Sequence, residues 1–311
     1  RYLRMRSLLA RRGPTIAGIA SLIFCLNLSA QDTAMRYPSD LMTRVRDAAD
    51  SILGDFPQSI AYAKVAESHR AYSAIIEDGS EDTFVSARTA FQIRYAQSSI
   101  MIDSGMDEEV HTYYGFGRNE PYFANVNQDV QLALFEADQI IITHEHGDHV
   151  SGVIRSPFFQ QIAAKTLVTE AQVNTLVNNP QLPQIQLTPE QADQLRVVEY
   201  GLTFPVAPGV VLIKSPGHTP GHQMVYVKTA AEREYLFVGD IGWSMVNFSE
   251  LKLRPESTRS RIGENAEALM NQMVWIREVM DDEGVIVVPS HDNILLEEYV
   301  AEGLLGDSLR L

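Results

Sequence analysis

Three of the eight histidines in the chain lie within six residues, directly after an apolar run. The segment reads THEHGDH, so His144 and His146 are two residues apart. Side chains at this spacing on an extended chain point to the same side. Gly147 then allows a sharp turn toward Asp148 and His149. A protein core would have to bury these polar groups without partners, so the cluster indicates a metal site.

Three later motifs carry the same kinds of side chain. SPGHTPGHQ contains His218, YLFVGD ends in Asp240, and VVPSHD contains His291. Each motif follows an apolar run typical of a strand, so we expect these strand ends to meet at one edge of a sheet. Imidazole and carboxylate groups are ligands that Zn²⁺ favours, with Mn²⁺ and Fe²⁺ as rivals.

The motifs, in this order, resemble those of the metallo-β-lactamase superfamily, whose signature is HxHxDH. IMIDSG is similar to an early motif of that family, in which an aspartate, here Asp103, supports the site. The set of candidate metal ligands is similar to that of lactonases and glyoxalase II. By this resemblance one metal would be bound by His144, His146 and His218. The other would be bound by Asp148, His149 and His291, with Asp240 bridging both.

The resemblance implies an α/β fold, the four-layer αββα sandwich, in which two facing mixed sheets are flanked by helices and the metals lie at a sheet edge. Two zinc ions per chain would turn water into a bridging hydroxide, and catalytic Asp148 would orient it and carry its proton. The expected chemistry is hydrolysis. We interpret His222 as structural, and Glu145 as solvated or supporting.

Asp240 and Trp243 help to indicate which enzyme class of the superfamily the chain resembles. Its β-lactamases generally lack the bridging aspartate, whereas its lactonases share HTPGH and that aspartate. The lactonases also have a tyrosine three residues later that assists ring opening, where this chain has Trp243. We therefore expect a carbonyl ester, lactone or thioester to be cleaved. The alternatives are a β-lactam hydrolase, an iron-dependent persulfide dioxygenase-like oxidoreductase and a non-catalytic zinc module.

The chain is expected to consist of three parts, and the last of them contains the strands and helices that position these motifs. Residues 1–30 have the layout of a signal peptide, residues 31–57 predict a helical arm, and residues 58–311 would form the hydrolase domain. Residues 105–129 look like a long loop without regular structure, typical either of a lid or binding loop or of a surface excursion that packs its aromatic side chains onto the body. Tyr113 and Tyr114 in this loop, together with Trp243, are the candidate substrate contacts.

Charge and composition exclude some partners. The formal net charge is −15, and the five arginines of residues 1–30 face no acid, which leaves 20 basic against 40 acidic side chains. Such a surface repels nucleic acid and anionic lipid, so we expect a small-molecule substrate, no nucleic acid and no stable membrane insertion after signal removal. The expected location is periplasmic or secreted. The one cysteine, Cys25, lies in the signal, so the mature chain would bind metal without thiolates.

Overall fold

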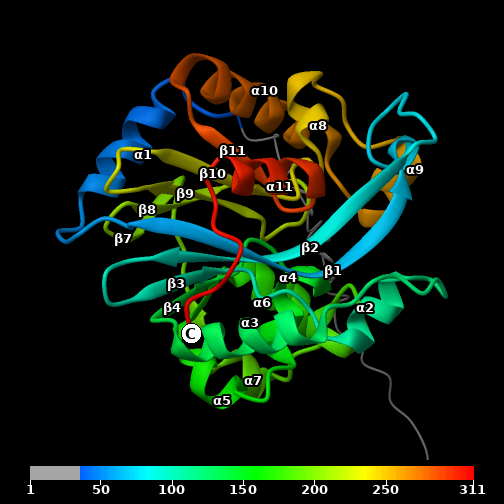
Figure 1. Cartoon of the computed structure of the whole chain (residues 1–311), viewed down its shortest axis with the longest axis horizontal. Helices are drawn as coiled ribbons and strands as arrows, with labels where there is room; N and C mark the ends of the chain where they lie inside the picture. Colours follow the sequence, from blue (N-terminus) through cyan, green and yellow to red (C-terminus); the bar gives the residue numbers. More distant parts are fainter. Residues whose placement is uncertain (1–35) are drawn as a thin grey trace, which may run out of the picture. The chain divides into compact units, whose positions relative to one another are not determined.

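The structure is a computed structural model that describes residues 36–311. Two mixed β-sheets face each other, and helices cover the outer face of each sheet (Figure 1). In spatial order the first sheet has six strands, β1 (Ser59–Ala71), β2 (Thr83–Arg94), β3 (Ser99–Ile102), β4 (Gln139–Ile141), β5 (Thr166–Val168) and β6 (Arg196–Val197). The second has five, β11 (Ile286–Pro289), β10 (Glu234–Gly239), β9 (Gln223–Lys228), β8 (Val210–Lys214) and β7 (Thr203–Ala207).

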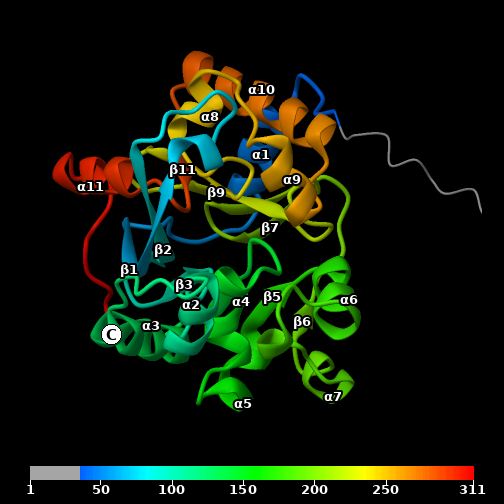
Figure 2. The same ribbon diagram turned by 90° about the vertical axis from the view of Figure 1, so that its right-hand side faces the viewer.

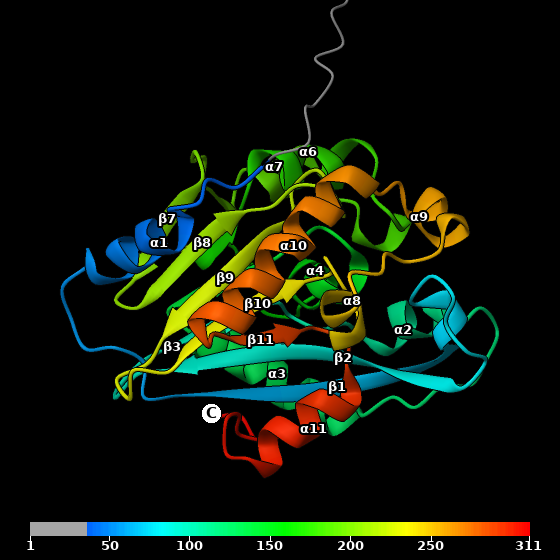
Figure 3. The same cartoon turned by 90° about the horizontal axis from the view of Figure 1, so that it is seen from above.

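Two helical layers enclose these sheets, as Figure 2 shows. The first sheet is covered by α2 (Glu108–Tyr114), α3 (Ala124–Glu136), α4 (Gly147–Ile154), α5 (Phe159–Ile162), α6 (Glu170–Asn178) and α7 (Pro189–Ala192). Over the second lie α1 (Leu41–Asp50), α8 (Met245–Ser249), α9 (Glu256–Ile262) and α10 (Ala266–Glu283). Figure 3 shows α10 crossing the strands of the second sheet. The last helix, α11 (Asn293–Ala301), follows β11 beside the sheet edge. The predicted αββα sandwich is confirmed.

Three apolar cores follow from this layering. The central core joins both sheets, for example Phe91 of β2 to Phe237 of β10, whose rings lie 4.9 Å apart. The other two lie between each sheet and its helices. Strands with apolar side chains on both faces are expected in a sheet covered on both sides. The buried strands therefore form a rigid base for the loops at their ends.

The predicted N-terminal helix is present, but it is not a separate arm. Leu41, Val45 and Ala49 recur at helical spacing on one side of α1 and are buried against the second sheet. The helix therefore belongs to the outer layer. The predicted signal, residues 1–30, lies outside the described residues. No helix within residues 36–311 combines the length and apolar character needed to cross a bilayer.

The prediction that residues 105–129 lack regular structure is wrong. The Asp107 side chain caps α2 by accepting a hydrogen bond from the Val110 amide, and two glutamates lie in the first turn. Residues from Ala124 onward belong to α3. The concentration of aromatic side chains and glycines concealed this capping signal. Only residues 115–123 form an irregular connection between the two helices.

Candidate metal centre

The seven predicted ligands follow strands of both sheets and converge at one edge. β4 ends at Ile141 and leads into the THEHGDH segment. His218 lies between β8 and β9, Asp240 follows β10, and His291 follows β11. The seven side chains form two clusters, His144, His146, His218 and Asp240, and Asp148, His149 and His291. All seven are buried.

In the first cluster three imidazoles point to one place. His218 Nε2 lies 2.9 Å from His146 Nδ1. The His144 ring centroid lies 4.9 Å from that of His146 and 4.7 Å from that of His218. His144 Nε2 is buried without a hydrogen-bond partner among residues 36–311. A buried nitrogen of this kind needs a partner, and a metal ion provides one.

The Asp240 carboxylate lies between the two clusters, and its Oδ2 is close to both, since it also lies 3.2 Å from His291 Nε2. Its Oδ2 lies 3.4 Å from His218 Nε2 and 3.7 Å from His144 Nε2. Its Oδ1 lies 3.3 Å from His149 Nε2 and 3.0 Å from His291 Nε2. Oδ1 also has no hydrogen-bond partner in the described part of the chain. This carboxylate can therefore bridge two ions, one in each cluster.

Most ligand histidines are held through the ring nitrogen that faces away from the cluster. For Nδ1 the partners are Thr143 Oγ1 at 3.1 Å from His144, Asp103 Oδ2 at 2.7 Å from His149, Glu264 Oε1 at 2.6 Å from His218, and Ala87 O at 2.6 Å from His291. Acceptors at this position orient imidazoles for metal binding and leave Nε2 free. The arrangement is that of a metal centre.

The protonation of the histidines also suits cation binding. Burial, then His218, lowers the pKa of His146 to about 3, so this ring is neutral, as a metal ligand must be. Burial alone would lower the pKa of His149, but nearby carboxylates, first Asp240, outweigh it and raise the pKa well above its usual value. The excess negative charge around His149 therefore favours a proton on this ring. A bound metal ion would take the place of that proton.

Gly239 makes the sharp delivery of Asp240 possible. Its φ of 52° lies in the left-handed region, at a register shift between β10 and β11. A Cβ atom here would lie 2.5 Å from His222 Nε2. His222 accepts a hydrogen bond from the Asp240 amide at 3.1 Å, and its Nδ1 lies 2.8 Å from Ser215 Oγ. This ring is thus placed to support Asp240 from behind.

Glu145 lies between two ligands, where the sequence predicts a solvated or supporting side chain; it is buried and not solvated. Its oxygens accept hydrogen bonds from Thr219 Oγ1 at 2.7 Å and from the Gly221 amide at 3.1 Å. Burial raises the pKa of Glu145. The carboxylate therefore holds the loop that carries His218 against the loop that carries His146.

Trp243 lies next to the centre and has a bonded indole nitrogen. Its Nε1 donates to Asp240 Oδ2 at 2.8 Å, and the Arg254 guanidinium lies 4.8 Å from its ring centroid. Arg254 also donates to the Asp240 carbonyl at 2.9 Å and pairs with Glu264, which holds His218. Sequence reasoning missed Arg254 and Glu264, because their partners are far away in the chain.

Arg88 is a further residue that sequence reasoning missed. It is buried in β2 and pairs with Asp148 Oδ2. Its only signal in the sequence is that one positively charged residue lies in the middle of the strand sequence VSARTAFQI. Burial alone would raise the pKa of Asp148, but Arg88 and nearby imidazoles outweigh it and hold the pKa below its ordinary range. Asp148 is therefore an ionised carboxylate.

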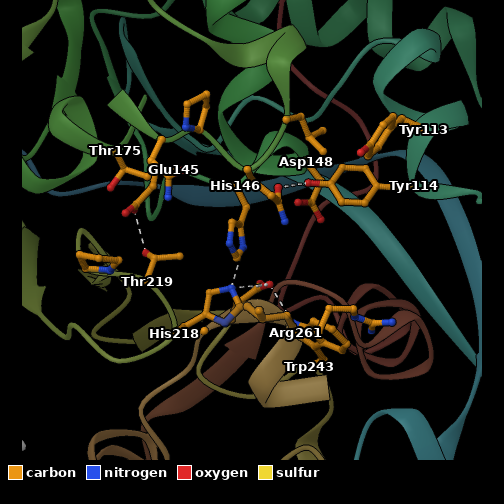
Figure 4. A pocket seen from close by; sticks show the side chains of 18 of the residues that line it. Tyr113, Tyr114, Glu145, His146, Asp148, Thr175, His218, Thr219, Trp243 and Arg261 are labelled. Carbon is orange, nitrogen blue, oxygen red and sulfur yellow. Dashed lines mark hydrogen bonds and ion pairs between the residues drawn. The ribbon is translucent and has the colours of Figure 1, made fainter. Parts of the chain in front are cut away.

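A cavity of about 750 Å³ opens over the centre. Its wall includes His146, Asp148, His218 and Asp240, together with all three candidate substrate residues, Tyr113, Tyr114 and Trp243. Figure 4 shows the two tyrosines on one side of the cavity and Trp243 with Arg261 on another. Side-chain amides of α6 and the loop after it, including Asn178 and Gln181, form a polar wall. The cavity can hold a small molecule against the metal cluster.

A comparison with protein families agrees with this geometry. Residues 85–291 match the model of the metallo-beta-lactamase superfamily, which is more than half of the chain. The chain belongs to the metallo-beta-lactamase superfamily. With its two metal-binding clusters, it is a metallo-hydrolase of this superfamily.

Relatives within the superfamily include lactonases. An N-acyl homoserine lactonase from a Bacillus species is 24% identical over 212 residues, which is 63% of this chain and 77% of the relative. A solved N-acyl homoserine lactone hydrolase, with its product bound at the catalytic metal centre, has a TM-score of 0.62 at 17% identity over 78% of this chain and 96% of that one. A dizinc quorum-quenching lactonase has a TM-score of 0.52 at 14% identity, covering 76% and 92%. The solved structures show a common fold.

Proposed function

We propose that this protein is a two-zinc hydrolase that opens lactone rings, with N-acyl homoserine lactones as its substrate class. The observation that carries the proposal is Asp240, whose carboxylate lies between two ligand clusters at the base of the cavity. The names of the relatives favour a lactone over the ester and thioester that the sequence also allows. A cavity of about 750 Å³ has room for a lactone ring and an acyl chain.

A pair of bound zinc ions would activate water at neutral pH and polarise the carbonyl group of the substrate. The chain's own residues then set the positions. Asp148, ionised beside Arg88, orients the attacking water rather than holding its proton for long. Trp243 and His222 keep Asp240 in place through hydrogen bonds to Oδ2 and to the amide. Buried carboxylates thus surround the reacting atoms while the cavity holds the rest of the substrate.

Ring opening also needs a proton for the leaving alkoxide, and we assign this role to Tyr114. The indole N–H of Trp243 is already bonded to Asp240 and is too weak an acid. Tyr114 lines the cavity, and its hydroxyl donates to Gln181 Oε1 and accepts from the Gly147 amide at 3.1 Å, so its proton must turn from Gln181 to the substrate. Burial, then Asp148, raises the pKa of Tyr114 well above its usual value. The phenol therefore remains protonated and able to donate.

Metal analysis combined with a substrate panel tests the proposal. The panel contains an N-acyl homoserine lactone, a thioester, a β-lactam and a phosphodiester, together with a persulfide under oxygen monitoring. We expect two zinc ions per chain and fastest turnover of the lactone. One iron per chain with oxygen uptake on persulfide would overturn hydrolysis, and a β-lactam preference would overturn the lactone.

A pair of matched variants connects the activity to the centre. His146→Ala removes a ligand of the first cluster, and we expect at least a 100-fold loss of kcat/KM. His69→Ala removes an exposed histidine on β1, whose side chain is 47% exposed, and we expect unchanged turnover. Full activity in His146→Ala would contradict the proposed site.

Export is a separate proposal. It rests on the arginines, apolar stretch and small residues of 1–30. Cell fractionation of the full chain in a bacterial host should recover the protein in the periplasm or medium, shortened at its N-terminus. An unprocessed protein in the cytoplasm would contradict it.

A further inference from the structure

Arg88 brings a positive charge directly to a proposed metal ligand. Its side chain is buried on β2 and reaches Asp148 at the start of α4. Lys64 and Ala66 of β1 flank a register shift, and Ala66 is the strand partner of Arg88. A bulge of this kind turns the neighbouring side chains. The Arg88 guanidinium lies 5.4 Å from the Tyr114 ring centroid and extends beneath the cavity.

The guanidinium and the second cluster compete for the same carboxylate oxygen. Asp148 Oδ2 pairs with Arg88 Nη1. This oxygen also lies 3.7 Å from His149 Nε2 and 3.6 Å from His291 Nε2. A divalent ion held by these three groups would therefore share its carboxylate with a cation and lie close to that cation. Both effects weaken binding.

Arg88 has no other acid to neutralise it within residues 36–311. Its Nη2 donates to the Ser68 hydroxyl at 3.3 Å, and its Nε is buried without a partner. The positive charge therefore remains directed at Asp148. The Arg88–Asp148 pair is buried in a region of low dielectric. There the positive guanidinium strongly repels a metal ion bound nearby.

The first cluster lacks this conflict. The guanidinium of Arg254, which contacts Asp240, is paired with Glu264, so its charge is matched by a second carboxylate that is not in the cluster. It contacts Asp240 through the carbonyl oxygen of the backbone and leaves both carboxylate oxygens free of arginine. Three imidazoles and an Asp240 oxygen therefore face the first ion, with no guanidinium from residues 36–311 bound to any of them.

We propose that Arg88 makes the two metal clusters unequal, so that the chain binds one ion tightly through His144, His146 and His218 and a second ion weakly through Asp148, His149 and His291. The proposal rests on the two-metal function above. It assigns to Arg88 a positioning role toward Asp148 that sets how readily the second ion enters. The protein would then exist with one or two ions, depending on the supply of zinc.

Zinc titration of the metal-free full chain, in competition with a chromophoric chelator, tests the proposal without any substrate. We expect two dissociation constants that differ by about 10-fold or more, because one cluster meets a guanidinium and the other does not. In Arg88→Met the second constant should tighten by about 10-fold, since the side chain keeps its bulk and loses its charge. Co²⁺ absorption spectra follow the same two steps.

Two control variants separate charge from packing. Arg88→Lys keeps a positive charge, so the gap between the two constants should remain. Arg155→Met removes an arginine that ends α4 and pairs with Asp107, away from the clusters, and should also leave the gap unchanged. If circular dichroism shows that Arg88→Met is unfolded, Arg88→Gln replaces it.

Equal constants in the wild type would overturn the inference, as would an unchanged gap in a folded, uncharged Arg88 variant. Neither result affects the proposed function if two zinc ions bind and the lactone is hydrolysed. Failure of zinc to bind, or a metal-loaded protein inactive on every lactone, would instead overturn the proposed function. The two failures are therefore distinguishable.

Discussion

At the residue scale, most ligands depend on a second side chain or backbone group that holds them. His218 is the clearest case, since Glu264 binds its Nδ1 and is itself paired with Arg254. The Glu264 and Arg254 side chains are fully buried. A buried pair of this kind stabilises only while both partners are present. The orientation of His218 is thus coupled to folding.

The pH dependence of stability tests this coupling. Burial alone would raise the pKa of Glu264, but Arg254 and His218 outweigh it and lower the pKa to about 2, against 4.5 when unfolded. Ionised Glu264 therefore stabilises the fold above pH 4.5, and this contribution is lost as the pH falls from 4.5 toward 2. In Glu264→Gln, we expect the unfolding free energy of metal-free protein at pH 7 to fall by about 3 kcal/mol.

Urea unfolding at several pH values measures this effect. Wild type should lose stability more steeply than Glu264→Gln between pH 4.5 and 3. Glu298→Gln, on the exposed part of α11, is the control and should follow the wild type. Parallel curves for wild type and Glu264→Gln would show that Glu264 is not held as an anion.

Tyr114 gives a second residue-scale prediction, based on its proposed role as proton donor. Tyr114→Phe should lower kcat on an alkyl lactone by about 100-fold with little change in KM, because the alkoxide then leaves without a proton. Aryl esters, whose leaving groups need no proton, should be affected by less than about 5-fold. Steady-state kinetics on both substrates measure the difference. Tyr113→Phe is the matched control, and an equal loss on both substrates would contradict the role.

At the element scale, the N-terminus of α6 holds two ligand loops together. Gln172 completes a capping box with Thr169. Its side-chain amide also donates to the carbonyls of Ile142, Thr143 and Gly221, at 3.0, 3.2 and 2.9 Å. A buried amide that shares its two N–H donors among three carbonyls links the loops that carry His144 and His218. The helix therefore organises the centre although it supplies no ligand.

Replacement of this glutamine measures the role of α6. Gln172→Met should lower the unfolding free energy by about 1–3 kcal/mol, because the buried Gly221 carbonyl loses its side-chain donor, whereas the Ile142 and Thr143 carbonyls still accept from Gln223. Chemical denaturation gives the value. Gln191 occupies the same position in the capping box of α7 without these long-range bonds, so Gln191→Met should cost no more than about 1 kcal/mol. Equal losses in the two variants would refute the bridging role.

The site was more predictable than the elements that surround it. The predicted ligands could be found because each motif follows an apolar strand and the chemistry restricts the residue types. The helix α2 was missed, since its cap at Asp107 is a short signal within an aromatic segment. Arg88 and Glu264 could not be assigned, because their partners Asp148 and His218 are 60 and 46 residues away. Local pattern carries no information on such pairs.

At the scale of the whole molecule, both sheets contribute ligands, so metal binding should stabilise the entire fold. An ion that binds only the native state raises stability in proportion to the logarithm of its concentration over Kd. Removal of metal by a chelator should lower Tm by about 10 °C, and added Zn²⁺ should restore it. Differential scanning calorimetry measures both steps. His146→Ala should respond to the chelator by a smaller shift, and a wild type unaffected by chelation would contradict metal-linked folding.

The central claim is that the Asp240 carboxylate lies between two metal ions at the base of the cavity. Crystals grown with excess Zn²⁺, with diffraction measured on both sides of the zinc absorption edge, test it directly. Our account predicts two anomalous peaks, one among His144, His146 and His218 and the other among Asp148, His149 and His291, with an Asp240 oxygen bound to each. No peak at the three histidines of the first cluster, or two peaks that share no Asp240 contact, would contradict it.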